Sequence, residues 1–320
     1  MSQLPERVLI WDRIGANRRN TAIFFVLFAL LIAAFIAAIG TFVAAYAGVA
    51  EEDLPRVIIQ VSIAAALVST AFGIMMYFAA AAAVLSISGA HEVTKEDEPE
   101  LYRVVENLCI GAGLPMPRVH VIADSAPNAF ATGRDPANAH VAVTRGLLDK
   151  LEKRELEGVI AHELSHVGNY DVRLMTLVAV AVGMIVMVSD LMLRFTWYGA
   201  GARRSNRGKG GGGLAVILLL VAILFMVLAP VMAMLLRMAL SRQREYLADA
   251  SGALLCRNPD ALADALEKIA ADPEPLETAN KGTAHLYIYN PLREHQSFLN
   301  NLFSTHPPID ERVRLLRAMA

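Results

Sequence analysis

Residues 159–168 read VIAHELSHVG, which places two histidines, His162 and His166, four positions apart, with Glu163 directly after the first. Positions four apart lie on one face of a helix, so both imidazoles can reach a single metal ion. Glu163 would then lie beside the metal, where it can take a proton from an attacking water. The pattern predicts a zinc site with two histidine ligands and a glutamate as general base.

The residues around this pattern are apolar, and they include Val159, Ile160, Ala161, Leu164 and Val167. A helix with such flanks is expected to be buried, with the histidines and the glutamate as its polar exceptions. Burying ionisable groups is costly unless they pair or bind a metal. The flanks therefore favour a metal site over the alternative, a surface helix that carries these residues incidentally.

A catalytic zinc ion usually has three protein ligands and one open position, so a further ligand is needed. The segment 241–250, SRQREYLADA, offers Glu245 and, four positions later on the same helical face, Asp249. Glu245 can complete the ligand set for one Zn²⁺ per chain, and Asp249 can accept the remaining ring N–H of a ligating histidine. Taken alone, this string is equally compatible with a solvated, charged helix end.

Long apolar stretches accompany these residues and raise the hydrophobic share of the chain to 55%, above the roughly 45–50% of soluble proteins. The stretches at 22–49 and 57–87 carry no charge, and each is long enough to span a bilayer as a helix. They predict a transmembrane hairpin. A signal peptide, the alternative for the first stretch, would be shorter and would end in a small-residue cleavage site. Two further apolar stretches follow at 172–193 and 214–240.

The remaining segments are typical of a folded domain outside the membrane. Arg118–Ala123 and His140–Val143 alternate like short strands, and helical spacing occurs at 96–108, 261–271 and 311–319. The expected fold is an α-helical integral membrane protein with four apolar helices in two hairpins and a mainly helical zinc protease domain that carries a small β-sheet. The domains expected are an N-terminus at 1–21, a membrane hairpin at 22–87, a first catalytic segment at 88–171, a second hairpin at 172–240, and a second catalytic segment at 241–320.

This arrangement explains how distant ligands can meet. The HExxH pattern directly precedes the third apolar stretch, and Glu245 directly follows the fourth. If these two stretches form a hairpin, its ends meet at one membrane surface, and the active site should lie there.

Positive charges favour the cytoplasmic side of a membrane. Arg7, Arg13, Arg18 and Arg19 precede the first span, so the N-terminus and both catalytic segments are expected in the cytoplasm. The glycine-rich loop 194–213 has five basic residues and no acidic ones, yet four spans would place it outside. The third and fourth stretches can therefore also be a re-entrant or protein-buried pair.

Several other functions are disfavoured. A net charge of −2 gives no electrostatic case for nucleic-acid binding. Cys109 and Cys256 are too few for a disulfide framework or a thiolate zinc site, and they are interpreted as ordinary thiols. The glycines of 194–213 do not follow the order of a phosphate-binding loop. A transporter would need ionisable residues inside its spans, and the first two spans have none.

The string VIAHELSHVGNYD, followed by two apolar stretches and SRQREYLADA, resembles the HtpX-type membrane zinc metalloproteases. The chain is more distantly similar to the CAAX prenyl endopeptidases. PNAFATG at 127–133 and STHPPIDERVRLL at 304–316 also resemble this family, so the likeness covers nearly the whole chain. It implies a gluzincin-like domain with zinc ligands at His162, His166 and Glu245.

The resemblance also implies residues that contact the substrate. An edge strand around Asn128, Ala129 and Phe130 would pair with substrate backbone, although Asn128 can also be a turn residue after Pro127. His306 would lie near the substrate and stabilise the tetrahedral oxyanion, or it would only cap a loop. Arg312 or Arg314 could assist there or brace Asp249.

The function expected is a zinc endopeptidase of a bacterial inner membrane, with its site facing the cytoplasm. Its partners would be the lipid bilayer and polypeptide substrates, and the resemblance implies that these are above all misfolded or damaged membrane proteins. A CAAX-type prenyl-peptide endopeptidase and a non-catalytic, zinc-stabilised membrane adaptor are the alternatives. Glu163 argues against the adaptor, because zinc binding alone does not need it.

Overall fold

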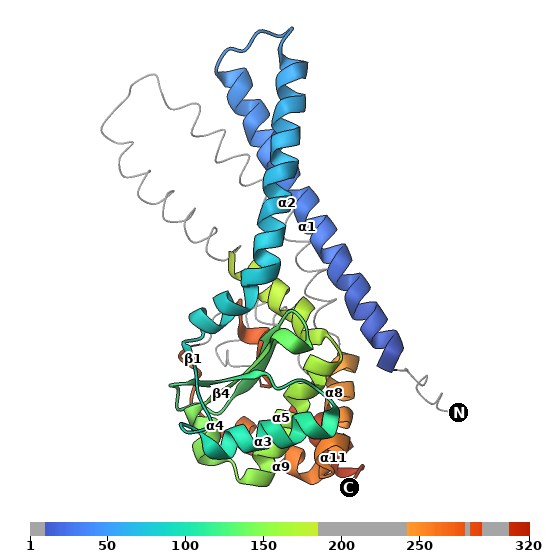
Figure 1. The fold of residues 1–320 in the computed structure, drawn as a ribbon, viewed down its shortest axis with the longest axis vertical. Helices are drawn as coiled ribbons and strands as arrows, with labels where there is room; N and C mark the ends of the chain where they lie inside the picture. The colour runs from blue at the N-terminus through green and yellow to red at the C-terminus, as the bar shows by residue number, and fades with distance from the viewer. Residues whose placement is uncertain (1–9, 185–241, 279–281, 290–306) are drawn as a thin grey trace. The chain divides into compact units, whose positions relative to one another are not determined.

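The computed structural model describes residues 10–184, 242–278, 282–289 and 307–320 (Figure 1). The loop 194–213, the fourth apolar stretch and His306 lie outside these residues. By its contacts the chain divides into two units. One comprises 1–21, 79–184 and 237–320, and the other comprises 22–78 and 185–236.

The described part of the second unit belongs to two long apolar helices, α1 (Ile10–Tyr46) and α2 (Leu54–Ile87). The first residues of α1 and the last residues of α2 belong to the first unit. Both are long and apolar enough to cross a membrane, as predicted. Aromatic rings join them inside this unit, where Phe28 stacks on Phe72 and Phe25 contacts Tyr77. Many other large apolar side chains on these helices are exposed, as a lipid environment allows, among them Leu30, Ile59 and Leu67.

The first unit contains a four-stranded sheet with the order β1-β2-β4-β3. The strands are β1 (Ala90–Glu92), β2 (Arg118–Ile122), β3 (Ala129–Gly133) and β4 (Ala139–Thr144). Strands β2 and β4 run parallel, whereas β1 and β3 are antiparallel to their neighbours. The two strands predicted from alternation are confirmed, and β3 forms one edge of the sheet.

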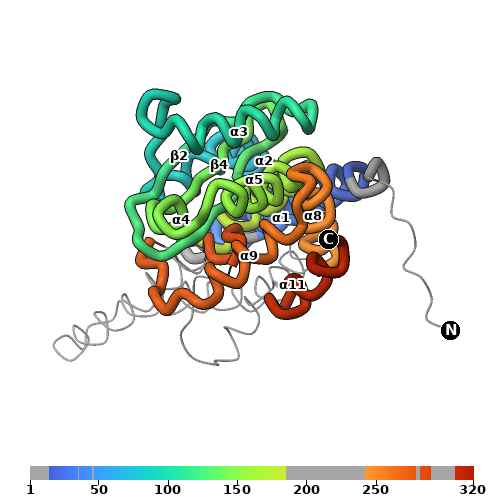
Figure 2. Tube along the Cα trace, turned by 90° about the horizontal axis from the view of Figure 1, so that it is seen from below, coloured from blue at the N-terminus to red at the C-terminus, as the bar shows by residue number. Residues whose placement is uncertain are grey.

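Helix α5 (Lys153–Gly168) carries the HExxH pattern and lies between the sheet and the other helices. A capping box formed by Glu152 and Glu155 begins it. Figure 2 shows α5 with α3 on one side and α8 and α9 on the other. The other labelled helices of the first unit are α3 (Pro99–Ala112), α4 (Arg145–Lys150), α8 (Arg242–Cys256), α9 (Pro259–Ala271) and α11 (Ile309–Arg317).

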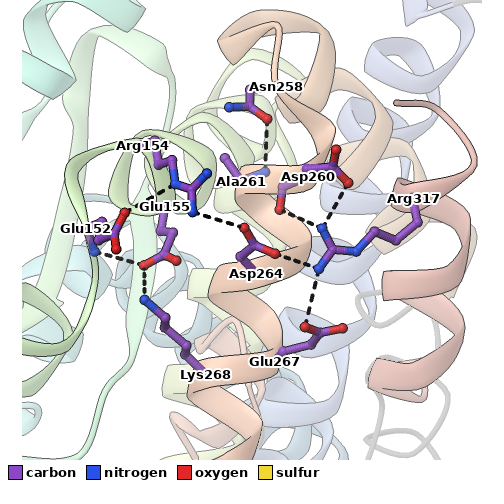
Figure 3. A network of polar contacts seen from close by, with 10 residues as sticks. All are labelled: Glu152, Arg154, Glu155, Asn258, Asp260, Ala261, Asp264, Glu267, Lys268 and Arg317. Carbon is purple, nitrogen blue, oxygen red and sulfur yellow. Dashed lines mark hydrogen bonds and ion pairs between the residues drawn. The ribbon is translucent and has the colours of Figure 1, made fainter.

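A polar network fastens the start of α5 to α9 and α11 (Figure 3). Lys268 pairs with the buried carboxylate of Glu155 at 2.7 Å, and Arg317 contacts Asp260 at 2.9 Å and Asp264 at 2.5 Å. Exposed ion pairs contribute about 0–1 kcal/mol each, so the apolar contacts beneath them supply most of the stability. The network mainly fixes how these helices are aligned.

The third apolar stretch begins inside the protein. A helix at Asp171–Met184 follows α5 after a bend of 89°. Its Met175 and Ala179 are buried in one cluster with Leu85 and Tyr287. The described start of this stretch is therefore enclosed by protein, and the count of four spans stays a prediction because 185–241 lie outside the described residues.

The close approach of α8 to α5 depends on Gly252. A Cβ atom there would lie 2.9 Å from the backbone nitrogen of His162 and 3.0 Å from its Cα. We predict that Gly252→Ala pushes α8 away from α5, lowers the stability by roughly 1–3 kcal/mol and weakens metal retention, because α8 carries Glu245. Thermal unfolding and metal content in detergent measure both effects.

Gly111→Ala in α3 is the matched control, since its Cβ would meet only the tip of Leu255 at an ordinary 3.5 Å. That variant should be unchanged or up to about 1 kcal/mol more stable, because alanine favours the helix. Equal behaviour of the two variants would show that the α5–α8 contact tolerates a methyl group.

Candidate active site

The HExxH residues lie on the buried face of α5, where His162, Glu163 and His166 are each at most 4% exposed. The Nε2 atoms of the two histidines lie 3.2 Å apart. Glu245, in the first turn of α8, places one carboxylate oxygen 3.8 Å from Nε2 of His162 and the other 3.7 Å from Nε2 of His166. The structure thus brings together the three residues predicted as ligands.

A carboxylate lies next to the other ring nitrogen of each histidine. Nδ1 of His162 lies 2.9 Å from Asp249, and Nδ1 of His166 lies 3.1 Å from Asp171. An Nδ1–H that donates to a carboxylate leaves the Nε2 lone pair available to a metal. Both lone pairs then face the space that Glu245 closes.

These donor atoms fit a single zinc-sized ion. Zn–N bonds of about 2.0–2.1 Å with tetrahedral angles place two nitrogens roughly 3.3 Å apart, close to the observed 3.2 Å. The carboxylate oxygens are only slightly farther, and all ligand atoms lie within 4.8 Å of one another. Within the described ranges, no other group of three such side chains is arranged in this way.

Asp249 is held by Arg312, whose side chain is fully buried. The guanidinium donates to both carboxylate oxygens, at 2.8 and 2.7 Å. Burial opposes ionisation of Asp249, but the charge and hydrogen bonds of Arg312 lower its pKa to about 2. Arg312 is therefore the arginine that braces Asp249, whereas Arg314 is exposed and pairs weakly with Glu311 at 3.8 Å.

Sequence reasoning missed Asp171, the carboxylate that faces His166. It is 1% exposed and lies in the first turn after the bend that follows α5. The sequence gives one indication of this contact, because Asp171 follows the predicted ligand His166 by only five residues.

The environment shifts the pKa values of Glu163 and His166. Burial raises the pKa of Glu163 to about 7, against the opposing charge of His166. Burial would lower the pKa of His166, but its hydrogen bond to Asp171 and the charge of Glu245 raise it to about 9, so ligation of a metal through Nε2 would release a proton from His166.

The predicted substrate strand coincides with β3, and its atoms already have partners in the chain. Ile288 donates its backbone N–H to the carbonyl of Ala129 at 2.9 Å, and the side chain of Asn128 donates to the carbonyl of Tyr289 at 3.0 Å. The buried ring of Phe130 packs edge-on against Tyr287. The role of these residues in substrate binding stays a prediction, as does that of His306, which lies outside the described residues.

Comparison with known proteins agrees with this geometry. The model of peptidase family M48 matches residues 95–320. The chain belongs to peptidase family M48. It is of the HtpX type, because "Protease HtpX homolog" of Lactobacillus helveticus is 41% identical over 312 residues, which cover 97% of this chain and all of that one. The homologue from Dictyoglomus turgidum is 51% identical over 236 residues, 74% of each chain.

Among solved structures, the M48 chain is similar to Ste24p of S. mikatae, with a TM-score of 0.45 and 18% identity. That alignment covers 78% of this chain and 57% of Ste24p. Together with the two apolar helices, the family makes this protein a membrane-bound metalloprotease.

Removal of the Arg312 guanidinium should destabilise the M48 protease strongly. Arg312→Met leaves the charge of Asp249 buried without its partner, which costs about 3–5 kcal/mol, and Arg312→Lys should restore little because lysine cannot form the two parallel bonds. Arg317→Met, at an exposed ion pair, is the control and should cost less than about 1 kcal/mol. Chemical unfolding in detergent measures both.

The loss should depend on pH. Because the pKa of Asp249 is depressed from 3.8 to about 2, its ion pair stabilises the fold fully above pH 4 and loses this effect as pH falls toward 2. Without Arg312, burial raises the pKa of Asp249, so the difference between the wild type and Arg312→Met should begin to shrink above pH 4 and continue to shrink toward pH 2. A difference that is constant from pH 7 to 3 would contradict the assigned ion pair.

Proposed function

We propose that this chain is a zinc-dependent endopeptidase that hydrolyses peptide bonds of misfolded or damaged membrane proteins. The observation that supports it most is the convergence of His162, His166 and Glu245 around one space, with Glu163 buried beside them. A zinc-stabilised adaptor would need the three ligands but not an additional ionisable group in an apolar interior. Burying such a group is costly, so its presence favours catalysis.

When bound, zinc lowers the pKa of water to about 7 and polarises the substrate carbonyl. Glu163 is placed to accept the proton of the attacking water and then to give it to the leaving amine. Burial raises the pKa of its carboxyl group, which favours acceptance of the proton. Asp249 and Asp171 keep the two imidazoles in the orientation that ligation needs.

We further propose that substrates pair with the outer edge of the sheet around Asn128, Ala129 and Phe130, at the start of β3. Ala129 already accepts the backbone N–H of Ile288, so a substrate strand that pairs at this position would replace that contact. The backbone of Ala131 hydrogen bonds to Glu163, so a strand that is paired there presents its peptide bonds to the base. Main-chain pairing gives affinity with little demand on sequence.

We place the site at the cytoplasmic surface of a bacterial inner membrane. The arginines before the first apolar stretch support this orientation. The catalytic segments 88–171 and 241–320 would form one site, and His306 is proposed as the donor that stabilises the oxyanion. The resemblance of STHPPIDERVRLL at 304–316 to the family supports this role.

Glu163→Gln and Glu245→Ala should separate catalysis from metal binding. Glu163→Gln removes the base but no ligand, so we expect zinc near one per chain and at least a 100-fold loss in the cleavage rate of casein or a membrane protein. Glu245→Ala removes a ligand and should lose both zinc and activity. Zinc content and cleavage by the detergent-solubilised chain are measured side by side.

Glu157→Gln changes a glutamate elsewhere on α5 and should behave like the wild type. Full activity of Glu163→Gln would refute the proposed base. A wild-type chain that binds zinc but cleaves no substrate would favour the adaptor, and a chain without zinc would remove the central proposal.

A further inference from the structure

Asn17 connects the start of α1 to the surroundings of the metal ligands. It precedes the first apolar stretch, yet its side chain is only 5% exposed. Its Nδ2 donates to the backbone carbonyl of Asn169 at 2.8 Å and to Oδ1 of Asp171 at 2.6 Å. All three residues belong to the unit that contains the active site.

The carboxylate of Asp171 is shared between Asn17 and the metal site. Oδ1 accepts from Asn17 and lies 3.3 Å from Nε of the buried Arg244, whereas Oδ2 faces Nδ1 of His166 at 3.1 Å. Donors on Oδ1 fix the rotation of the carboxylate. They thereby direct Oδ2 toward the histidine, which in turn directs Nε2 toward the ligand space.

The backbone at this point needs such support. Between α5 and the next helix, Tyr170 has φ of 61°, a left-handed conformation that is unfavourable for a residue other than glycine. Asn17 holds Asn169 and Asp171, the residues on either side of Tyr170. The neighbouring Arg18 places its guanidinium 4.6 Å from the centre of the Tyr170 ring.

We propose that Asn17 is a positioning residue of the metal site. It holds Asp171 in the rotation that orients His166, so the start of α1, which continues into the first apolar stretch, is also part of the active-site scaffold. This inference rests on the proposed function of His166 as a metal ligand. A neutral amide suits the task, because it donates to Asp171 without adding a charge next to His166.

The test uses the full chain in detergent with Asn17→Ala, Asn17→Asp and, as matched control, Asn20→Ala in the same helix. We measure the rate at which a chelator removes zinc, the spectrum of the cobalt-substituted protein, kcat and KM separately, and thermal unfolding. Asn17→Ala should weaken zinc binding about 10- to 100-fold, as other losses of a residue that orients a ligand do, and should lower kcat more than KM changes. Asn17→Asp should be worse, because it places a second carboxylate against Asp171.

Asn20→Ala should leave zinc retention, the cobalt spectrum and kcat unchanged. If Asn17→Ala lowers only the unfolding temperature and leaves zinc retention, kcat and the cobalt spectrum like those of the wild type, its role is structural and the inference is overturned. If the wild type itself binds no zinc, the proposed function fails together with the inference. The zinc content of the wild type therefore distinguishes the two failures.

Discussion

The burial of four ionisable side chains at one point is the constraint on which the rest of this structure depends. His162, Glu163, His166 and Glu245 are each at most 6% exposed in an apolar interior. Burying such groups without partners is costly, whereas a metal ion together with matched carboxylates can make the arrangement favourable. The fold can therefore be understood as the means by which partners are brought to α5.

These partners come from segments that are distant in sequence. Asp249 lies on α8, one turn after Glu245. It comes close to α5 because Gly252 allows the backbones of α8 and α5 to approach closely. Arg312 arrives on α11 and neutralises Asp249 in the interior. His162, Asp249 and Arg312 thus lie one after another outward from the metal site. Each of the three lies against a group of opposite charge or a hydrogen-bond partner.

The features of the site that follow local rules could be predicted from sequence. The HExxH spacing and the spacing from Glu245 to Asp249 are helical, and the alternation in β2 and β4 identifies strands directly. Asp171 and Asn17 could not be found in this way. Their contact depends on the bend of 89° after α5 and on the positive φ of Tyr170. Tyrosine rarely adopts a positive φ, so its presence in the sequence does not indicate this conformation.

The apolar stretches of the sequence also do not coincide with the units defined by packing, and the reason is physical. An apolar stretch shows where a helix avoids water, but it does not distinguish lipid from a protein interior. The end of α2 illustrates this, because Val84 and Leu85 belong to an apolar stretch and yet pack with Phe130 and Tyr287 behind the sheet. Since α1 supplies Asn17 and α2 supplies these core residues, the ends of both membrane helices are built into the catalytic unit. A fragment that begins after the first hairpin would lack both, so the catalytic segments are better regarded as one body with the ends of their membrane helices than as a soluble domain on an anchor.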